Sequence, residues 1–125
     1  VAEDTVFTGF VDEDTATGLY LRSDLFLFPS VCDNFGLTKT EAAVLGTPTL
    51  ALEGTAVAEG IENGINGFVS AQSEEAFAAR LLDALSDRDR LAEVAENARH
   101  TLGRTWEELA PVTLEMTKRV VQGES

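Results

Sequence analysis

Residues 25–46, LFLFPSVCDNFGLTKTEAAVLG, decide the fold of this chain. They open with an apolar run over 25–28, which is long enough for a buried strand and short for a helix, and Pro29 ends that run. After a loop that contains Gly36, apolar residues return at helical spacing, which predicts a helix over 37–45. The start of a helix offers unpaired N–H groups and the positive end of a dipole, which suit a phosphate. In an open parallel sheet, such a junction lies outside the carboxyl ends of the strands, where ligands bind.

The flanking sequence repeats this alternation of short apolar runs and helical patterns. Further strands are expected over 6–11, 49–52 and 67–70, and short helices over 15–22 and 55–62. Unbroken apolar runs predict strands that are covered on both faces, as in parallel sheets. The sequence therefore predicts an α/β fold: a Rossmann-like doubly wound parallel sheet of about four strands, with helices on both faces and a helical C-terminal part.

The C-terminal part is expected to hold three helices. Ser73 is a suitable N-cap for the first, whose apolar face would carry Phe77, Leu81, Leu82 and Leu85. The second begins at Asp87 or Asp89 and would direct inward Leu91, Val94, Ala95, Ala98 and Leu102. A capping box, Thr105-x-x-Glu108, opens the third, and Pro111 should kink or break it.

Composition and charge restrict the class of protein. The chain has 125 residues, 44% of them hydrophobic and 25% charged, as expected for one small globular domain. No apolar run approaches the roughly 18 residues of a membrane span, and no signal-peptide pattern opens the chain, so a cytoplasmic location is expected. The formal net charge of −13 argues against nucleic acid or an anionic membrane as a partner of this chain.

Residues that could carry other chemistry have simpler interpretations. The single Cys32 excludes an internal disulfide and lacks an evident base to activate it. With His100 as the only histidine, a zinc site is not expected, and His100 falls on the polar side of its helix. The triplet Asp12-Glu13-Asp14 has the form of an Asp-x-Asp metal motif, but acids are common at a helix start and only one strand precedes them. We interpret the triplet as surface acids.

A family resemblance rests on residues 33–48. The run Asp33-Asn34-Phe35-Gly36-Leu37-Thr38-Lys39-Thr40-Glu41-Ala42-Ala43, followed by Gly46-Thr47-Pro48, resembles the signature of retaining GT-B glycosyltransferases of the group-one (family four) type. That signature is acid-x-Phe-Gly-Leu-x-x-x-Glu-Ala, then Gly-x-Pro. Four further segments agree with the family's order: VFTGFV at 6–11 precedes the signature, and it is followed by AEGI at 58–61, NGINGF at 63–68 and TWE at 105–107. The resemblance implies that residues 1–125 are a partial GT-B C-terminal, nucleotide-sugar-binding domain, without its first two βα units and without the N-terminal domain.

The resemblance also implies roles in the site. Glu41, the second acid of the signature, would bind the ribose hydroxyls, and Asp33, the first acid, would lie near the transferred sugar. These two are the implied catalytic residues. Asp33 stands where the family usually has Glu, one methylene longer, so Asn34 or a water would bridge to the sugar. Backbone N–H groups would meet the sugar and the distal phosphate from Phe35, Gly36, Leu37 and Thr38, with the Thr38 hydroxyl as a further donor. Two alternatives stay open: Thr38-x-x-Glu41 also fits a capping box, and Asp33 also suits a turn or an N-cap.

The implied function is donor binding in a retaining glycosyltransferase. The parent would transfer a sugar from a UDP- or GDP-sugar to an acceptor hydroxyl, with no metal or other cofactor, and the acceptor site would lie in the absent N-terminal domain. The parent is expected in the cytoplasm or peripheral at a membrane, and the isolated chain is expected to be inactive. One alternative is a non-catalytic nucleotide-sugar binding or interaction module, favoured by the short start, Asp33 and the acidic charge. Another is a fragment of a GT-B sugar-nucleotide epimerase, against which the signature itself argues.

The family's strand order has a consequence for the fold. In the order 3-2-1-4-5-6, two strands that this chain lacks would separate the segments 6–11 and 25–28. Without them, the strand over 25–28 becomes an exposed apolar edge, which is prone to pairing with another chain. Either the segment 6–11 or a second chain is expected to cover it, so self-association is expected.

Overall fold

The structure is a computed structural model that describes residues 2–32, 37–103 and 118–123. Its elements, in chain order, are a 3-10 helix η1 (Ala2–Asp4), α1 (Glu13–Arg22), β1 (Phe26–Phe28), α2 (Leu37–Val44), β2 (Thr49–Leu52), β3 (Phe68–Ser70), α3 (Glu74–Leu85) and α4 (Arg88–Thr101). The three strands form one parallel sheet in the order β1-β2-β3. The predicted α/β fold with a parallel sheet is confirmed.

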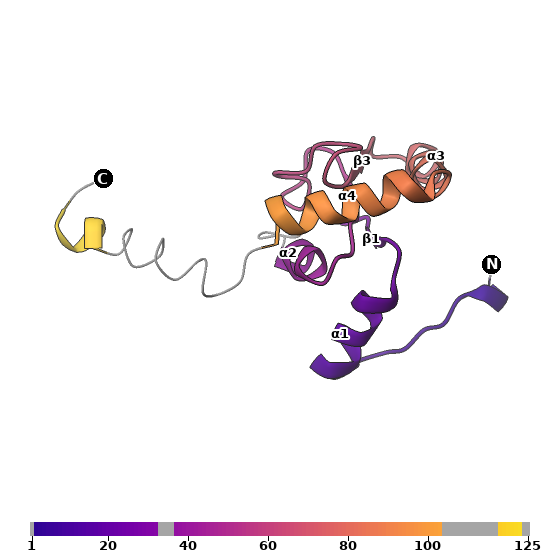
Figure 1. Cartoon of the computed structure of the whole chain (residues 1–125), viewed down its shortest axis with the longest axis horizontal. Helices are drawn as coiled ribbons and strands as arrows, with labels where there is room; N and C mark the ends of the chain where they lie inside the picture. Colours follow the sequence, from indigo (N-terminus) through magenta and orange to yellow (C-terminus); the bar gives the residue numbers. More distant parts are fainter. Residues whose placement is uncertain (1, 33–36, 104–117, 124–125) are drawn as a thin grey trace.

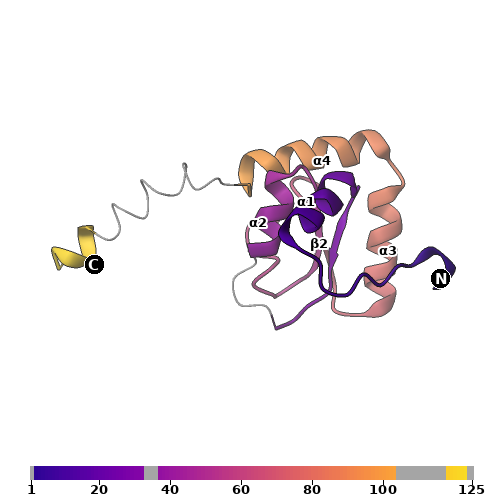
Figure 2. The ribbon, with the colours of Figure 1, turned by 90° about the horizontal axis from the view of Figure 1, so that it is seen from below.

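The sheet is covered by helices on both faces. In Figure 2, β2 lies between α2 and α3, and α4 runs across from one of these helices to the other. All four residues of β2 are buried, as its unbroken apolar run predicts. The core cluster combines this strand with β3, α3 and α4 and consists of Leu50, Phe68, Ala84, Leu91 and Val94.

The helices α1, α3 and α4 each begin directly after a polar residue whose side chain caps the helix. The carboxylate of Asp12 accepts a hydrogen bond from the Thr15 N–H at 2.7 Å. Hydrogen bonding by the Thr15 side chain, and secondly by its backbone N–H, lowers the pKa of Asp12. Ser73 and Asp87 cap α3 and α4 in the same way. The acidic triplet at 12–14 is therefore the start of a helix, as we interpreted it.

The turn after α2 is set by Gly46. This glycine has a φ of +82°, its N–H donates to the Ala43 carbonyl at 3.0 Å, and the Thr47 N–H donates to the Ala42 carbonyl at 2.8 Å. These two bonds are those of a Schellman motif, which requires a left-handed residue. A Cβ on Gly46 would also lie 2.7 Å from Nη2 of Arg99 on α4. The turn thus leads directly from α2 into β2, beside β1.

The predicted strand over 6–11 is wrong. This segment is irregular and belongs to no sheet, with Gly9 at a φ of +65°, and it runs away from the body of the molecule in Figure 1. The exposed fractions of Val6, Phe7 and Phe10 are 83%, 92% and 109%. The backbone groups of a strand need a neighbouring strand to pair with, and in the described ranges no strand lies beside the segment 6–11. The sheet therefore has three strands rather than about four.

Other predicted elements are shorter or different. The predicted helix over 55–62 is a series of turns, because its hydrogen bonds close over three residues and Gly60 adopts a φ of +80°. On α3, Phe77 and Leu81 pack against the core, but Leu82 is 71% exposed, so the predicted apolar face is too wide. The predicted helix from Thr105, with its proline, falls largely outside the described residues.

We propose that the free edge of β1 pairs with a second copy of this chain. Among the described strands, β1 pairs with β2 alone, and Leu27 in its middle is 42% exposed. Light scattering of the purified chain should therefore show dimers or larger species whose share rises with concentration. A Leu27→Lys variant should shift the population to monomer, since an edge lysine opposes strand pairing.

The matched control is Leu82→Lys, which places the same charge on an equally apolar but distant exposed position of α3. It should leave the association unchanged. A wild-type chain that stays strictly monomeric at all concentrations would exclude the proposed pairing.

Candidate functional site

The candidate site lies at the carboxyl ends of β1 and β2. The two strands are parallel and Phe28 pairs with Ala51, so their carboxyl ends leave the sheet side by side. α2 begins at Leu37, within ten residues of the end of β1. Four of the predicted site residues, Asp33, Asn34, Phe35 and Gly36, lie outside the described residues, so their roles stay predictions. Leu37, Thr38 and Glu41 lie on α2, where the sequence places them.

Thr38 carries an unused hydroxyl. It is the second residue of α2, and its Oγ1 is buried without a hydrogen-bond partner among the described residues. The capping-box interpretation of Thr38 and Glu41 is therefore wrong: the helix begins before Thr38, and its hydroxyl does not bond to a backbone N–H. A buried hydroxyl without a partner carries a desolvation cost that a bound polar ligand would relieve.

Glu41 follows Thr38 by about one helical turn and is exposed. Within the part of the chain that the structure describes, its carboxylate forms no salt bridge. Burial, and secondly the negative charge of Glu41, raise the pKa of the Tyr20 phenol on α1. The Tyr20 ring packs against Phe26 at 5.3 Å between centroids, and its backbone carbonyl accepts a hydrogen bond from the Thr47 hydroxyl. These contacts fix α1 beside the helix that bears Glu41.

Lys39 is a site residue that the sequence reasoning missed. It is only 8% exposed, and its Nζ donates a hydrogen bond to the backbone carbonyl of Glu59, in the loop after β2. Burial lowers the pKa of Lys39, while the charge of Glu59 acts in the opposite sense. A signal was available in the sequence, since Lys39 shares a helical face with Ala42 and Ala43, which are both buried.

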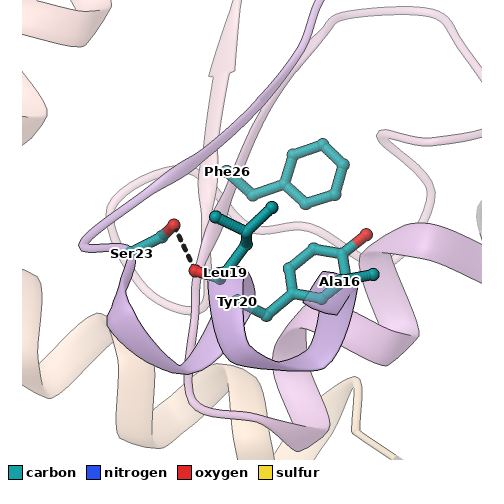
Figure 3. Close-up of a pocket in the computed structure, with 5 residues that line it drawn as sticks. All are labelled: Ala16, Leu19, Tyr20, Ser23 and Phe26. Atoms are coloured by element: carbon teal, nitrogen blue, oxygen red, sulfur yellow. Dashed lines mark hydrogen bonds between the residues drawn. The ribbon is translucent and has the colours of Figure 1, made fainter. Parts of the chain in front are cut away.

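Two hollows flank the sheet. The larger, of about 540 Å³, lies at the carboxyl ends of the strands and is lined by Pro29, Val31, Leu52, Gln72, Ser73, Glu74, Phe77, Ala78 and Leu81. The smaller, of about 280 Å³, lies between α1 and the amino end of β1 and is lined by Ala16, Leu19, Tyr20, Ser23 and Phe26 (Figure 3). In it, Ser23 Oγ donates to the Leu19 carbonyl at 2.6 Å, which closes the end of α1. Of these two hollows among the described residues, the larger opens at the edge where parallel sheets bind ligands.

The described ranges offer few other reactive groups. They contain no group of three or more His, Cys, Asp or Glu side chains that could hold a metal ion. Cys32 is exposed, and His100, also exposed, lies 2.9 Å from Glu96 on the polar side of α4, as predicted. In the same ranges, every helix is too short or too polar to cross a bilayer.

Comparison with known proteins decides the family. The protein-family model described as "Glycosyl transferases group 1" matches residues 1–101. The chain belongs to the group 1 glycosyl transferases. A D-inositol 3-phosphate glycosyltransferase of Rhodococcus jostii is 35% identical over 104 residues, which are 82% of this chain and 23% of that protein. The chain thus spans about a quarter of the length of this relative.

Two solved structures have a fold similar to that of this chain. Sucrose-phosphate synthase from Thermosynechococcus elongatus superposes with a TM-score of 0.83 at 20% identity, covering 98% of this chain and 31% of that one. The Anabaena protein HepE in complex with UDP-glucose superposes with a TM-score of 0.66 at 22% identity, covering 83% of this chain and 29% of that one. Both likenesses concern the fold.

The shifted pKa values of Lys39 and Tyr20 predict opposite effects of pH on stability. The pKa of Lys39 is lower in the folded chain, so between that value and the ordinary 10.5 the unfolded chain binds more protons. The free energy of unfolding should therefore rise with pH in this window, and Lys39→Met should remove the rise. The pKa of Tyr20 lies above the ordinary 10.0, so its contribution to stability should be lost as the pH rises through the folded value. Tyr20→Phe should remove that loss.

The measurement is denaturant unfolding of the wild type and both variants between pH 8 and 11, with differences taken from the wild type at each pH. If Lys39→Met and Tyr20→Phe change the slope of the free energy of unfolding against pH in the same direction, the surroundings assigned to Lys39 and Tyr20 are wrong.

Proposed function

We propose that the chain is the nucleotide-sugar donor-binding part of a retaining glycosyltransferase that transfers a sugar from a UDP- or GDP-sugar to an acceptor hydroxyl. One observation carries the proposal: the start of α2 presents a buried hydroxyl on Thr38 and, one turn further, an exposed carboxylate on Glu41. Among the described residues, the hydroxyl has no hydrogen-bond partner and the carboxylate forms no salt bridge. Both lie where parallel sheets bind ligands. The complex of the structurally similar HepE with UDP-glucose supports a nucleotide-sugar donor.

Each group would serve a different part of the donor. The Glu41 carboxylate has two acceptor oxygens, which match the two ribose hydroxyls. The first N–H groups of α2, with the Thr38 hydroxyl, would meet the sugar and the distal phosphate. As the glycosidic bond to the diphosphate breaks, negative charge builds on the leaving phosphate, and the positive end of the helix would stabilise it. Asp33 and Asn34, just before α2, would orient the transferred sugar. This assignment requires no metal ion.

The acceptor site belongs to the remainder of the parent. The chain spans 23% of the length of its Rhodococcus relative, so a further domain would supply the opposite wall of an active-site cleft. We place the parent in the cytoplasm or peripheral at a membrane, and we propose that residues 1–125 alone bind donor weakly and transfer no sugar.

A second candidate is a non-catalytic nucleotide-sugar binding or interaction module. The observation that favours it is electrostatic. The chain has a formal net charge of −13, and the only cation of α2, Lys39, is buried and donates to a carbonyl. A diphosphate would then depend on backbone N–H groups and on cations from elsewhere in the parent.

The two candidates differ in turnover. Titration calorimetry with UDP-glucose and a GDP-sugar, together with assays of sugar transfer and donor hydrolysis, should show binding and turnover by the full-length parent. The isolated chain should show weak binding and no turnover. Binding without turnover in the parent would favour the module. Turnover by the isolated chain, free of parent enzyme, would contradict the division of labour proposed here.

The ribose role of Glu41 predicts a specific sensitivity. Glu41→Gln keeps the shape of the side chain but turns one acceptor oxygen into a donor, so one ribose hydroxyl loses its partner. In the parent, the donor interaction should weaken by about 1–3 kcal/mol, measured from kcat/KM for the donor. The Glu41 carboxylate has no salt bridge among the described residues, so the free energy of unfolding of the chain should change by no more than about 0.5 kcal/mol.

Glu75→Gln, at an exposed position of α3, is the matched control and should change neither quantity. Donor kinetics that are unchanged in Glu41→Gln would remove Glu41 from the ribose site.

A further inference from the structure

We propose that Lys39 is a positioning residue of the donor site, which holds the loop after β2 against the signature helix α2. The inference rests on the proposed function. Lys39 lies on α2 between Thr38 and Glu41, and its Nζ donates to the carbonyl of Glu59, twenty residues further along the chain. The bond joins the segments that follow two neighbouring strands, β1 and β2, at the edge where the donor would bind.

The burial of the Lys39 ammonium group indicates a role beyond packing. Apolar side chains fill buried space without cost, whereas a cation loses hydration and needs partners. Lys39 is 8% exposed, and the flanking inward residues of its face, Ala42 and Ala43, are fully buried. A methionine of similar length would satisfy packing alone. The charged group adds a directional bond that packing cannot supply.

The loop that Lys39 holds is otherwise internally ordered. The Thr55 hydroxyl donates to the Leu52 carbonyl at 2.7 Å, and the Asn66 side chain accepts from the Glu62 N–H at 2.7 Å and donates to the Gly60 carbonyl at 3.0 Å. The same amide donates to Thr101 of α4 at 2.9 Å. These bonds brace the loop within itself and against α4. Lys39 provides the link to α2, so it sets the position of a braced loop relative to Thr38 and Glu41.

The chain itself gives the first test. Lys39→Met should speed amide hydrogen exchange at Ala58, Glu59 and Ile61, whose N–H groups bond within the loop, and leave amides in the middle of α4 unchanged. Lys39→Arg, which keeps a charged donor, should restore protection at least in part. Equal exchange in the wild type and Lys39→Met would overturn the proposal, because the loop would then be held without Lys39.

The parent gives the second test. With UDP-glucose as the donor, Lys39→Met should raise KM by about tenfold, the size expected for the loss of one hydrogen bond from a charged group, with kcat changed less than about twofold. Lys39→Arg should recover most of the loss. A loosened loop with unchanged KM would show that the bond serves only stability and would overturn the positioning role.

The proposed function fails in a different way. A wild-type parent that neither binds nor turns over nucleotide sugars would remove the donor site, and with it the role of Lys39 there, whatever the exchange data show. An active wild type with an equally active Lys39→Met variant would overturn the role of Lys39 alone.

Discussion

The burial of β2 is the constraint on which the structure depends. Its four residues are all buried, with β1 and β3 on its edges and α2 and α3 near its faces. Removing Leu50 and its neighbours from water supplies the main driving force, at about 25 cal/mol per Å² of apolar surface. Because β2 is covered on every side, its direction and register fix where β1 ends. The position of the candidate site follows from that.

The turn at Gly46 holds α2, which carries the candidate site residues Thr38 and Glu41, close to the sheet. A Schellman turn brings the chain from α2 into β2 without a long loop, so α2 must pack closely on the sheet. The start of the helix is therefore held at the carboxyl edge of β1 rather than left to a long connection. Rigid placement of N–H groups and of the Thr38 hydroxyl is what electrostatic stabilisation of a leaving diphosphate requires.

The charge distribution is compatible with the proposed anionic donor. The formal net charge is −13, yet the start of a helix attracts a phosphate through its backbone dipole rather than through side-chain charge. Glu41 would bind neutral ribose hydroxyls, so it need not repel the phosphates directly. Lys39 adds a structural link rather than a ligand, because its amine is buried against the carbonyl of Glu59.

Local sequence determined much of this protein. The apolar runs at β1, β2 and β3, the caps at Asp12, Ser73 and Asp87, and the glycine turn after α2 follow from backbone and side-chain chemistry within a few residues. The run from Asp33 to Glu41, together with Gly46-Thr47-Pro48 and four further segments in the family's order, indicated the group 1 family, which the match over residues 1–101 then established.

Tertiary structure decided what depends on distant partners. The segment 6–11 has the composition of a strand, but it joins no sheet, because strand formation requires a neighbour that no local pattern supplies. The capping box at Thr38 was locally plausible, yet the helix starts at Leu37 and leaves that hydroxyl without a partner among the described residues. The hydrogen bonds of the Tyr20 carbonyl with Thr47 and of Lys39 with the Glu59 carbonyl join residues 27 and 20 positions apart. They form only when α1 docks beside the turn after α2 and the loop after β2 docks on α2. Sequence periodicity could therefore place these residues on a face but could not name their partners.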